Sequence, residues 1–505
     1  MRKYEKLIID HSAPGKTGYV LPENDVANMA AGDVIPDSML RKNPANLPQV
    51  SEVEVVRHYT NLSQKNYGVD TGLYPLGSCT MKYNPKINED MASLEGLTDI
   101  HPYQPESTVQ GALELMYKFS ELFCELTGMA KCSLQPAAGA HGELAGLMII
   151  NAYHEARGDT NRNKIIVPDT SHGTNPASST VAGYEVVSIE SAPDGTVDLG
   201  KLKEVLDTDV AGLMLTNPNT LGIFEKNITE IAELVHEAGG LLYCDGANMN
   251  AIMGITKPGD MGFDVMHINL HKTLSTPHGG GGPGAGPIAV SEELSKFLPT
   301  PVIGDGSCDL KGDGSCGCAC GCDDSADKYY LDYDRPYSIG KIRSFYASYN
   351  VVIKAYSYIL TMGAEGLKKT SQTAVLNANY LKEHLKKYYD LPHDTTCMHE
   401  FVFSGLKDPN GIGALDIAKR LIDYGYHPPT IYFPITVDNA LMIEPTETES
   451  KETLDEFIEA MIMIAKEAAE SPELLRQAPV NAPVGRVDEL KALKNPILTW
   501  RGKNE

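Results

Sequence analysis

Two residues near the middle of the chain have types and positions that suit covalent chemistry on an aldehyde. Lys272 follows the apolar run 263–270 and lies in the stretch 267–287, which contains six glycines and three prolines. Lysine is seldom buried without a partner, and desolvation lowers the pKa of a buried lysine and frees its amine as a nucleophile. Such an amine forms a Schiff base with pyridoxal phosphate, the common aldehyde cofactor. The alternative is a surface lysine at a strand-to-loop junction.

Asp245 is the second candidate, at the end of the apolar run 241–244. A carboxylate at the C-terminal end of a strand in a parallel sheet points into the crevice where such folds bind ligands. Pyridoxal phosphate needs a carboxylate against its pyridine nitrogen, which keeps that nitrogen protonated, and such a hydrogen bond contributes about 1.5–3 kcal/mol. One helix-plus-strand unit separates Asp245 from Lys272, the spacing of neighbouring crossovers. Together the two residues favour the cofactor over the surface-lysine interpretation.

Composition limits the kinds of protein to which the chain can belong. The chain has 505 residues, which suggests two or three domains, and its 42% hydrophobic and 22% charged content is typical of a globular protein. A net charge of −24 argues against nucleic acid or an anionic membrane as a main partner. No run approaches the roughly 18 apolar residues of a membrane span. The N-terminus lacks the apolar core of a signal peptide, so we expect a cytoplasmic protein.

The first half of the chain is expected to supply an arm and a phosphate cradle. Residues 1 to about 110 are rich in Pro and Asn and predict an extended N-terminal arm, in which Ser78, Cys79, Thr80 and Lys82 either line a site or form an ordinary loop. A helix is expected from 111 to about 130, ending at Gly128. Small residues at 137–142 then lead into a second helix, whose N-terminus suits a phosphate group. The alternative there is a tight turn before a helix.

Alternating strands and helices predict a mostly parallel sheet from residue 163 onward. The expected strands are 164–168, 185–189, 211–216, 240–244, 264–269 and 287–290, and the expected helices include 199–206 and 228–238. His172 follows the first strand and is expected to stack on the cofactor ring, with a capped turn histidine as the alternative. Asn217 follows the third strand and is expected to bind a cofactor oxygen. Polar candidates recur at strand C-termini, where doubly wound sheets bind ligands.

Two phosphate-binding motifs are rejected. Gly279, Gly281 and Gly284 satisfy GxGxxG, but prolines interrupt the motif and a strand-like run follows it instead of a helix. We expect this loop to close over a substrate or to admit a long one. Residues 15–17, GKT, match only the end of the P-loop motif. The motif also begins with a glycine, and Asp10 stands at that position.

The second half of the chain contains an unusual insertion and a second domain. Five of the ten cysteines lie between Cys308 and Cys322, in a Gly/Ser/Asp-rich stretch at about 304–327. Soft metals or disulfides are possible uses, but a surface insertion is favoured and no metal is predicted. Arg335 and Arg343 suit a substrate carboxylate, although a structural ion pair is the favoured interpretation for each. Residues 351–505 predict an α+β domain and tail, with helices at 371–388 and 451–470 and strands near 397–404 and 431–436.

Several motifs together resemble one family, the glycine decarboxylase P protein of the glycine cleavage system. They are YPLGSCTMKYNP, QPAAGAHGE, DTSHGTNPAS, YCDGAN, HINLHKT with its glycine loop, SIGKIRSFYASY and YFPITVDNALMIEPTETESKETLDEF, and they run through most of the chain. The resemblance is to subunit 2 of the two-subunit form. The insertion at about 304–327 departs from the family pattern, which leaves its role open.

The resemblance implies an α/β fold of the type-I pyridoxal-phosphate class, with a large domain at 111–350 and a small α+β domain at 351–505. Lys272 would be the Schiff-base lysine, Asp245 the partner of the pyridine nitrogen and His172 the residue stacked on the ring. The resemblance also implies phosphate contacts at Ala138, Gly139 and Ala140, with Asn269 or His271. Ala247 is expected to be a further cofactor contact, beside Asn217.

The implied reaction is decarboxylation of glycine with transfer of the aminomethyl group to the lipoyl arm of H protein. The implied partners are subunit 1, in an α2β2 assembly, and lipoylated H protein, with no nucleic acid and no membrane. A site completed by residues across a subunit interface is a further hypothesis, suggested by the N-terminal arm. The alternatives are another pyridoxal-phosphate amino-acid decarboxylase of the same fold, a non-catalytic partner subunit, or a metal-handling protein that uses the cysteine-rich insertion.

Overall fold

The chain divides into two compact units. The computed structural model describes residues 6–43, 45–278, 284–306 and 328–498. One unit combines Met1–Gly72 with Ala478–Glu505, and the other is Leu73–Gln477. The predicted arm therefore ends at Gly72 rather than near residue 110, because Leu73 is already buried in a core of the larger unit. The glycine loop at 279–283, most of the cysteine-rich insertion and Trp500 lie outside the described residues.

The smaller unit contains short helices and extended chain. Its helices are η1 (Ile8–His11), α1 (Ala31–Val34), α2 (Glu52–Ser63) and α15 (Glu489–Lys494). Ser51 and Glu54 form a capping box at the start of α2, in which the Glu54 carboxylate accepts the Ser51 N–H at 2.9 Å. Large apolar side chains stand exposed along the arm, among them Tyr19 at 81% and Leu21 at 78%. This unit therefore presents apolar surface that its own fold does not bury.

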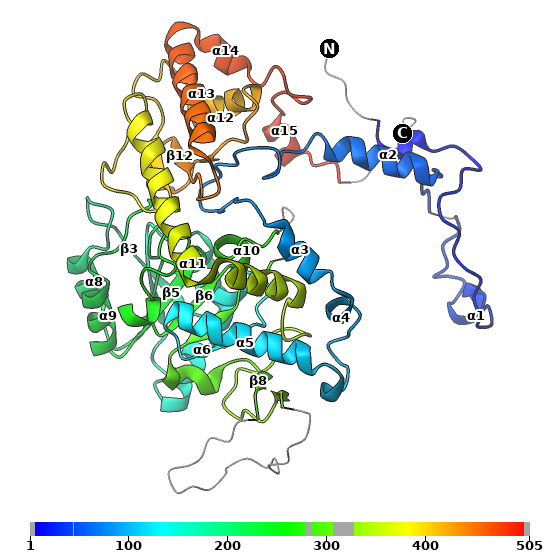
Figure 1. Cartoon of the computed structure of the whole chain (residues 1–505), viewed down its shortest axis with the longest axis horizontal. Coiled ribbons are helices and arrows are strands. Elements are labelled where there is room, and N and C mark those ends of the chain that lie inside the picture. The colour runs from blue at the N-terminus through cyan, green and yellow to red at the C-terminus, as the bar shows by residue number, and fades with distance from the viewer. Residues whose placement is uncertain (1–5, 44, 279–283, 307–327, 499–505) are drawn as a thin grey trace, which may run out of the picture. The chain divides into compact units, whose positions relative to one another are not determined.

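A seven-stranded sheet forms the centre of the larger unit (Figure 1). Its order is β1-β7-β6-β5-β4-β2-β3, and the strands β3, β2, β4, β5 and β6 run parallel to one another. β7 is antiparallel to both of its neighbours. The strand bounds are β1 Lys131–Ser133, β2 Lys164–Pro168, β3 Glu185–Ile189, β4 Val210–Leu215, β5 Leu241–Gly246, β6 Val265–Ile268 and β7 Ile288–Val290. The predicted parallel sheet is confirmed, and its strand bounds agree within one or two residues.

Helices bury both faces of this sheet, which explains why its strands read as continuous apolar runs. Successive residues of β5 contribute to different cores, Leu242 to one and Tyr243 to the other. The helices are α5 Gln110–Thr127, α6 Gly139–Arg157, α7 Thr174–Val181, α8 Leu199–Val205, α9 Ile228–Glu237 and α10 Leu270–Thr273. α5 ends at Gly128 with φ 73°, as the sequence predicts for a helix stop. α6 lies so close to β5 that a Cβ on Gly146 would come within 2.2 Å of the Tyr243 ring.

The C-terminal part of the larger unit forms the predicted small α+β domain. A three-stranded sheet of order β10-β12-β11 packs with helices around a separate core. Its elements are β10 Phe401–Ser404, α12 Ala414–Asp423, β11 Thr430–Ile431, β12 Ala440–Ile443, α13 Lys451–Glu470 and α14 Pro472–Gln477. β12, the central strand, was not predicted, and the predicted strand at 431–436 stops at Ile431 because Tyr432 has a φ of 59°.

One long helix joins the two domains of this unit. α11 spans Tyr349–Leu385 and is interrupted at Gly363, whose φ is 59°. Its first half packs in the core of the large sheet through residues such as Val351, and its second half packs in the small-domain core through residues such as Leu381. α11 therefore contributes to both cores. The remaining elements are α3 Lys86–Ala92, α4 Glu95–Thr98, η2 Glu106–Thr108, η3 Pro258–Met261, η4 Glu292–Phe297, β8 Val302–Gly304 and β9 Tyr330–Asp332. No helix among the described residues is long and apolar enough to cross a membrane.

Candidate functional site

A cavity of about 150 Å³ opens at the C-terminal ends of the parallel strands and reaches the small domain. Both Lys272 and Asp245 line it, so the two residues that suggested cofactor chemistry are brought together. The other lining residues are Ser78, Gly139, Ala140, Glu143, His172, Thr174, Thr216, Pro218, Asn219, Thr220, Ala247, Asn248, His267, Asn269, His399 and Glu400. All of them lie in the larger unit.

The sequence placed Lys272 at the end of a strand, but Lys272 lies in the short helix that follows this strand. β6 ends at Ile268, and Lys272 sits in the single turn of α10 instead of at the end of a buried strand. Its backbone N–H donates to the Asn269 carbonyl at 3.0 Å, which fixes this turn at the strand end. The side chain is half-buried and faces the cavity, where it is accessible to a ligand.

Asp245 is buried and held by three groups. Its Oδ2 accepts from Asn175 Nδ2 at 2.9 Å, and its Oδ1 accepts the Ala247 N–H at 3.0 Å. His267 Nε2 lies 3.4 Å from the same Oδ1. Burial alone would raise the pKa of Asp245, but His267, these hydrogen bonds and the Lys272 charge together hold it below its usual value. Asp245 is therefore an ionised carboxylate at a strand end.

His267 is a site residue that the sequence analysis missed. It lies in β6, is fully buried, and its Nδ1 lies 2.7 Å from the Tyr243 hydroxyl. Its Nε2 has no hydrogen-bond partner among the described residues. A histidine inside an apolar strand resembles an ordinary core residue, so only its position opposite Asp245 in the register of β5 and β6 reveals its role.

The N-terminus of α6 lies at the cavity, where the sequence predicts a phosphate cradle. Ala138 is the N-cap, and Gly139 and Ala140 of the first turn line the cavity. A Cβ on Gly139 would lie 2.7 Å from Asn269 Oδ1, so only glycine leaves this approach open. Asn269 Oδ1 and Thr216 Oγ1 are buried without hydrogen-bond partners among the described residues. Free N–H donors at a helix start and the unpaired Thr216 hydroxyl suit a bound phosphate.

His172 lines the cavity and is oriented by α7. Its Nδ1 accepts the Thr174 N–H at 3.2 Å and lies 2.8 Å from Thr174 Oγ1, which donates to Glu143 at 2.7 Å. Glu143 also accepts from Ser178 at 2.8 Å and was not predicted, although it lies one helical turn beyond Gly139. His172 is thus both a capped turn histidine and a cavity residue, so the two interpretations of it are compatible.

Three predicted cofactor contacts do not line the cavity. Ala138 contributes as the cap of α6, and the His271 ring lies 5.5 Å from the His278 ring, outside the lining. Asn217 Oδ1 accepts the Glu225 N–H at 2.9 Å, so its side chain holds the turn after β4, and its contact with the cofactor stays a prediction. Its neighbours Thr216 and Pro218 line the cavity instead.

The predicted carboxylate-binding arginines also lie outside the cavity lining. Arg335 pairs with Asp332 at 3.4 Å and donates to the Ser295 carbonyl at 2.7 Å, which matches the structural interpretation. Arg343 donates to the Gln135 carbonyl at 3.3 Å and to Ser348 Oγ at 3.1 Å.

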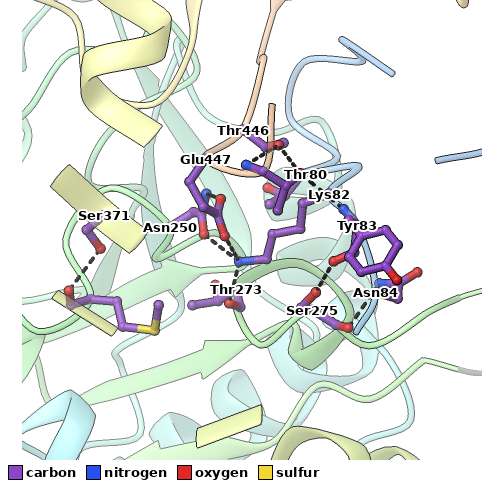
Figure 2. A network of polar contacts seen from close by, with 12 residues as sticks. Thr80, Lys82, Tyr83, Asn84, Asn250, Thr273, Ser275, Ser371, Thr446 and Glu447 are labelled. Carbon is purple, nitrogen blue, oxygen red and sulfur yellow. Dashed lines mark hydrogen bonds and ion pairs between the residues drawn. The ribbon is translucent and has the colours of Figure 1, made fainter. Parts of the chain in front are cut away.

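The segment after residue 77 lies against the site instead of forming a free loop, and Lys82 anchors it (Figure 2). Lys82 Nζ donates to Asn250 Oδ1 at 2.8 Å, to the Thr273 carbonyl at 2.9 Å and to Glu447 at 2.8 Å. Burial alone would lower the pKa of Lys82, but Glu447 and Tyr358 raise it above its usual value, so this lysine stays charged. Because Thr273 directly follows Lys272, this network holds the turn that carries Lys272.

Two further bonds fix the other side of that turn. The Ser275 hydroxyl donates to the Tyr83 carbonyl at 2.7 Å, and Asn84 Nδ2 donates to the Ser275 carbonyl at 2.9 Å (Figure 2). The YPLGSCTMKYNP motif therefore positions α10 from outside the sheet.

Comparison with known proteins shows the family to which the chain is similar. Residues 21–319 match the family described as "Glycine cleavage system P-protein", and residues 370–481 match "Glycine dehydrogenase, C-terminal domain". The chain is 64% identical over 99% of both chains to "Probable glycine dehydrogenase (decarboxylating) subunit 2" of Caldanaerobacter subterraneus. It is 58% identical, again over 99% of both chains, to the protein of the same name from Halalkalibacterium halodurans.

Solved structures share the fold at low sequence identity. A crystal structure of glycine decarboxylase (P-protein) of the glycine cleavage system, in inhibitor-bound form, aligns with a TM-score of 0.68 at 21% identity, covering 86% of this chain and 94% of the other. Glutamate decarboxylase of Lactobacillus brevis aligns with a TM-score of 0.62 at 12% identity, covering 90% and 96%. These likenesses support the type-I fold that the motifs implied.

Proposed function

Because this chain belongs to the glycine cleavage system P-protein family, as its glycine dehydrogenase (decarboxylating) subunit 2, we propose that the cavity around Lys272 is its pyridoxal-phosphate and glycine site. The family reaction is the decarboxylation of glycine. The observation that supports this placement is the convergence of an accessible lysine, an ionised aspartate and a helix N-terminus on one cavity.

The residues present fit the cofactor. Lys272 Nζ would hold its aldehyde carbon, Asp245 would hold its ring nitrogen in the protonated form, and the first turn of α6 would bind its phosphate. The bound cofactor supplies an electron sink for the pair released when CO2 leaves. Asp245 is prepared for this role because Asn175, Ala247 and His267 hold its charge in place.

His172 and Glu143 are proposed to orient the reactants from the α6–α7 side. The Thr174 N–H donates to His172 Nδ1, so the other ring nitrogen, Nε2, carries the proton and can donate toward the cavity. Glu143, through Thr174 and Ser178, keeps this face rigid. Together they would form one wall of the cavity, against which the cofactor ring would be held.

We propose two protein partners, the homologous subunit 1 and a lipoylated H protein, in an α2β2-type assembly with subunit 1. The designation "subunit 2" of the relatives and the family description support a multi-protein system. The exposed apolar side chains of the N-terminal arm, such as Tyr19 and Leu21, suit a surface that a partner covers. A cytoplasmic location is proposed with them, because the five described cysteines are free thiols, the usual state in a reducing compartment.

Isotope exchange tests this function. The chain is mixed with subunit 1, pyridoxal phosphate and glycine, and the incorporation of labelled bicarbonate into the glycine carboxyl is measured with and without lipoylated H protein. We expect exchange that depends on lipoylated H protein and is lost in Lys272→Ala. Exchange or decarboxylation of equal rate without lipoate would instead indicate a simple amino-acid decarboxylase of the same fold, and would overturn the proposal.

A further inference from the structure

Two glutamates of the small domain lie next to a buried histidine, and one of the two lines the cavity. Glu400 directly precedes β10 and Glu444 directly follows β12. Because Phe401 pairs with Ile443 in this antiparallel ladder, the two carboxyl groups emerge side by side. Side-chain atoms of His399, Glu400 and Glu444 lie within 4.8 Å of one another, and all three residues are buried. Glu400 and His399 line the cavity together with Lys272.

The hydrogen bonds of the two glutamates are unequal. Glu444 accepts from the Thr80 N–H at 2.9 Å, from Thr80 Oγ1 at 2.7 Å and from Asn248 Nδ2 at 3.2 Å. Glu400 accepts one bond, from the Ser78 N–H at 2.6 Å. Donors stabilise the ionised form of a carboxyl group, and a second carboxyl group close by disfavours it. Glu400 has one donor and Glu444 beside it, so Glu400 is the member of the pair that is disposed to hold a proton.

The surroundings of Glu400 agree with a neutral acid. Its burial and the charge of Glu444 raise its pKa well above the usual value, against the smaller opposing effects of the Ser78 N–H and Lys272. Burial lowers the pKa of His399, which therefore adds no positive charge. Burial also raises the pKa of Cys79 to about 11, so its thiol stays neutral. Lys272 and Glu444 are thus the charged groups that face Glu400.

We propose that Glu400 is the catalytic acid of this site, which holds one proton beside Lys272 and delivers it during each turnover. This inference rests on the proposed function. When the C–C bond of glycine breaks and CO2 leaves, the released electron pair ends in a new C–S bond to a cyclic disulfide. The S–S bond breaks, and its electron pair remains on the second sulfur. That sulfur takes the proton of Glu400, and the Glu400 carboxylate regains a proton from solvent after the product leaves.

The variant Glu400→Gln removes the acidic proton and keeps the shape of the side chain. Glutamine is neutral, and its amide oxygen still accepts the Ser78 N–H, but it has no acidic proton to give. We expect cofactor binding and borohydride labelling of Lys272 to persist, while kcat for aminomethyl transfer falls about 100- to 10,000-fold, the usual contribution of a general acid. Wild-type kcat should fall as pH rises through the pKa of Glu400, whereas the residual rate of the variant should not. Glu400→Asp should recover part of the rate.

A matched control is Glu449→Gln, which makes the same change in a half-buried glutamate outside the cavity lining. We expect wild-type rates from it. A Glu400→Gln enzyme with more than a tenth of the wild-type kcat, or with an unchanged pH profile, would overturn the proposal.

The protonation state can be measured without any turnover. A folded-state pKa above the unfolded value of 4.5 means that folding favours the protonated form, so the associated stability is present below pH 4.5 and is lost as pH rises. The equilibrium constant for folding is compared between the wild-type chain and Glu400→Gln. The ratio of wild type to variant should fall about tenfold per pH unit between pH 4.5 and the pKa of Glu400 in the folded protein. A constant ratio would refute the neutral glutamate. Because this titration uses neither glycine nor H protein, it distinguishes a failure of this inference from a failure of the proposed function.

Discussion

Replacing Lys82 with methionine tests how the turn that carries Lys272 is held. The Lys82 side chain is 1% exposed and its partner Glu447 is 9% exposed, so Lys82→Met leaves a buried carboxylate with only Asn250 as a donor. It also leaves the Thr273 carbonyl without the Lys82 bond. Removing one partner of a buried pair costs about 3–5 kcal/mol, a large share of the 5–15 kcal/mol that stabilises an ordinary domain. The methionine keeps the apolar stem, so the loss reports the ammonium group.

Urea unfolding at pH 7, monitored by circular dichroism, measures this loss. The pKa of Lys82 is raised in the folded protein, so its contribution is complete below about pH 10.5 and is lost only as pH rises through the folded value. The double variant Lys82→Met/Glu447→Gln removes both charges and should cost at least about 1 kcal/mol less than the sum of the two single changes. A loss below about 1 kcal/mol for Lys82→Met, or simple additivity in the double variant, would refute this reasoning.

Two further substitutions test the cofactor contacts. Asp245→Asn removes a buried negative charge and keeps the shape, so borohydride should still label Lys272 while the exchange rate falls about 100-fold or more; an unchanged rate would mean that Asp245 does not hold the ring nitrogen. Gly139→Ala places a Cβ 2.7 Å from Asn269 Oδ1. It should weaken pyridoxal-phosphate binding at least about tenfold in a fluorescence titration. The control Gly111→Ala in α5, where a Cβ meets nothing within 4 Å, should leave binding unchanged.

The sequence predicted the part of the site that comes from the parallel sheet. Lys272, Asp245 and His172 lie at or after strand ends, and strand ends of a parallel sheet meet at one edge, so local patterns were enough to place them together. Asn217 also follows a strand end, but its side chain turns back to the Glu225 backbone. Which way a side chain turns after a strand depends on the geometry of the following loop, which periodicity does not report.

The part of the site that comes from the small domain was not predicted. Glu400 lines the cavity with Glu444 beside it because β10 and β12 pair in an antiparallel register, and β12 was not recognised in the sequence. Lys82 was noted in the sequence, but its role as an anchor depends on contacts with Thr273 and Glu447, which are far away along the chain. Long-range pairings of this kind have no local signal.

The central claim is that Lys272 carries the cofactor, and an absorption spectrum tests it most directly. The chain, alone and with subunit 1, is incubated with pyridoxal phosphate, scanned before and after borohydride reduction, and digested for peptide mapping. We predict a visible band that borohydride removes, with the reduced cofactor fixed on the Lys272 peptide and with no band or label in Lys272→Ala. The exposed lysine variant Lys257→Ala should behave as wild type. A label on another lysine, or no band in the wild type even with subunit 1 present, would contradict the account.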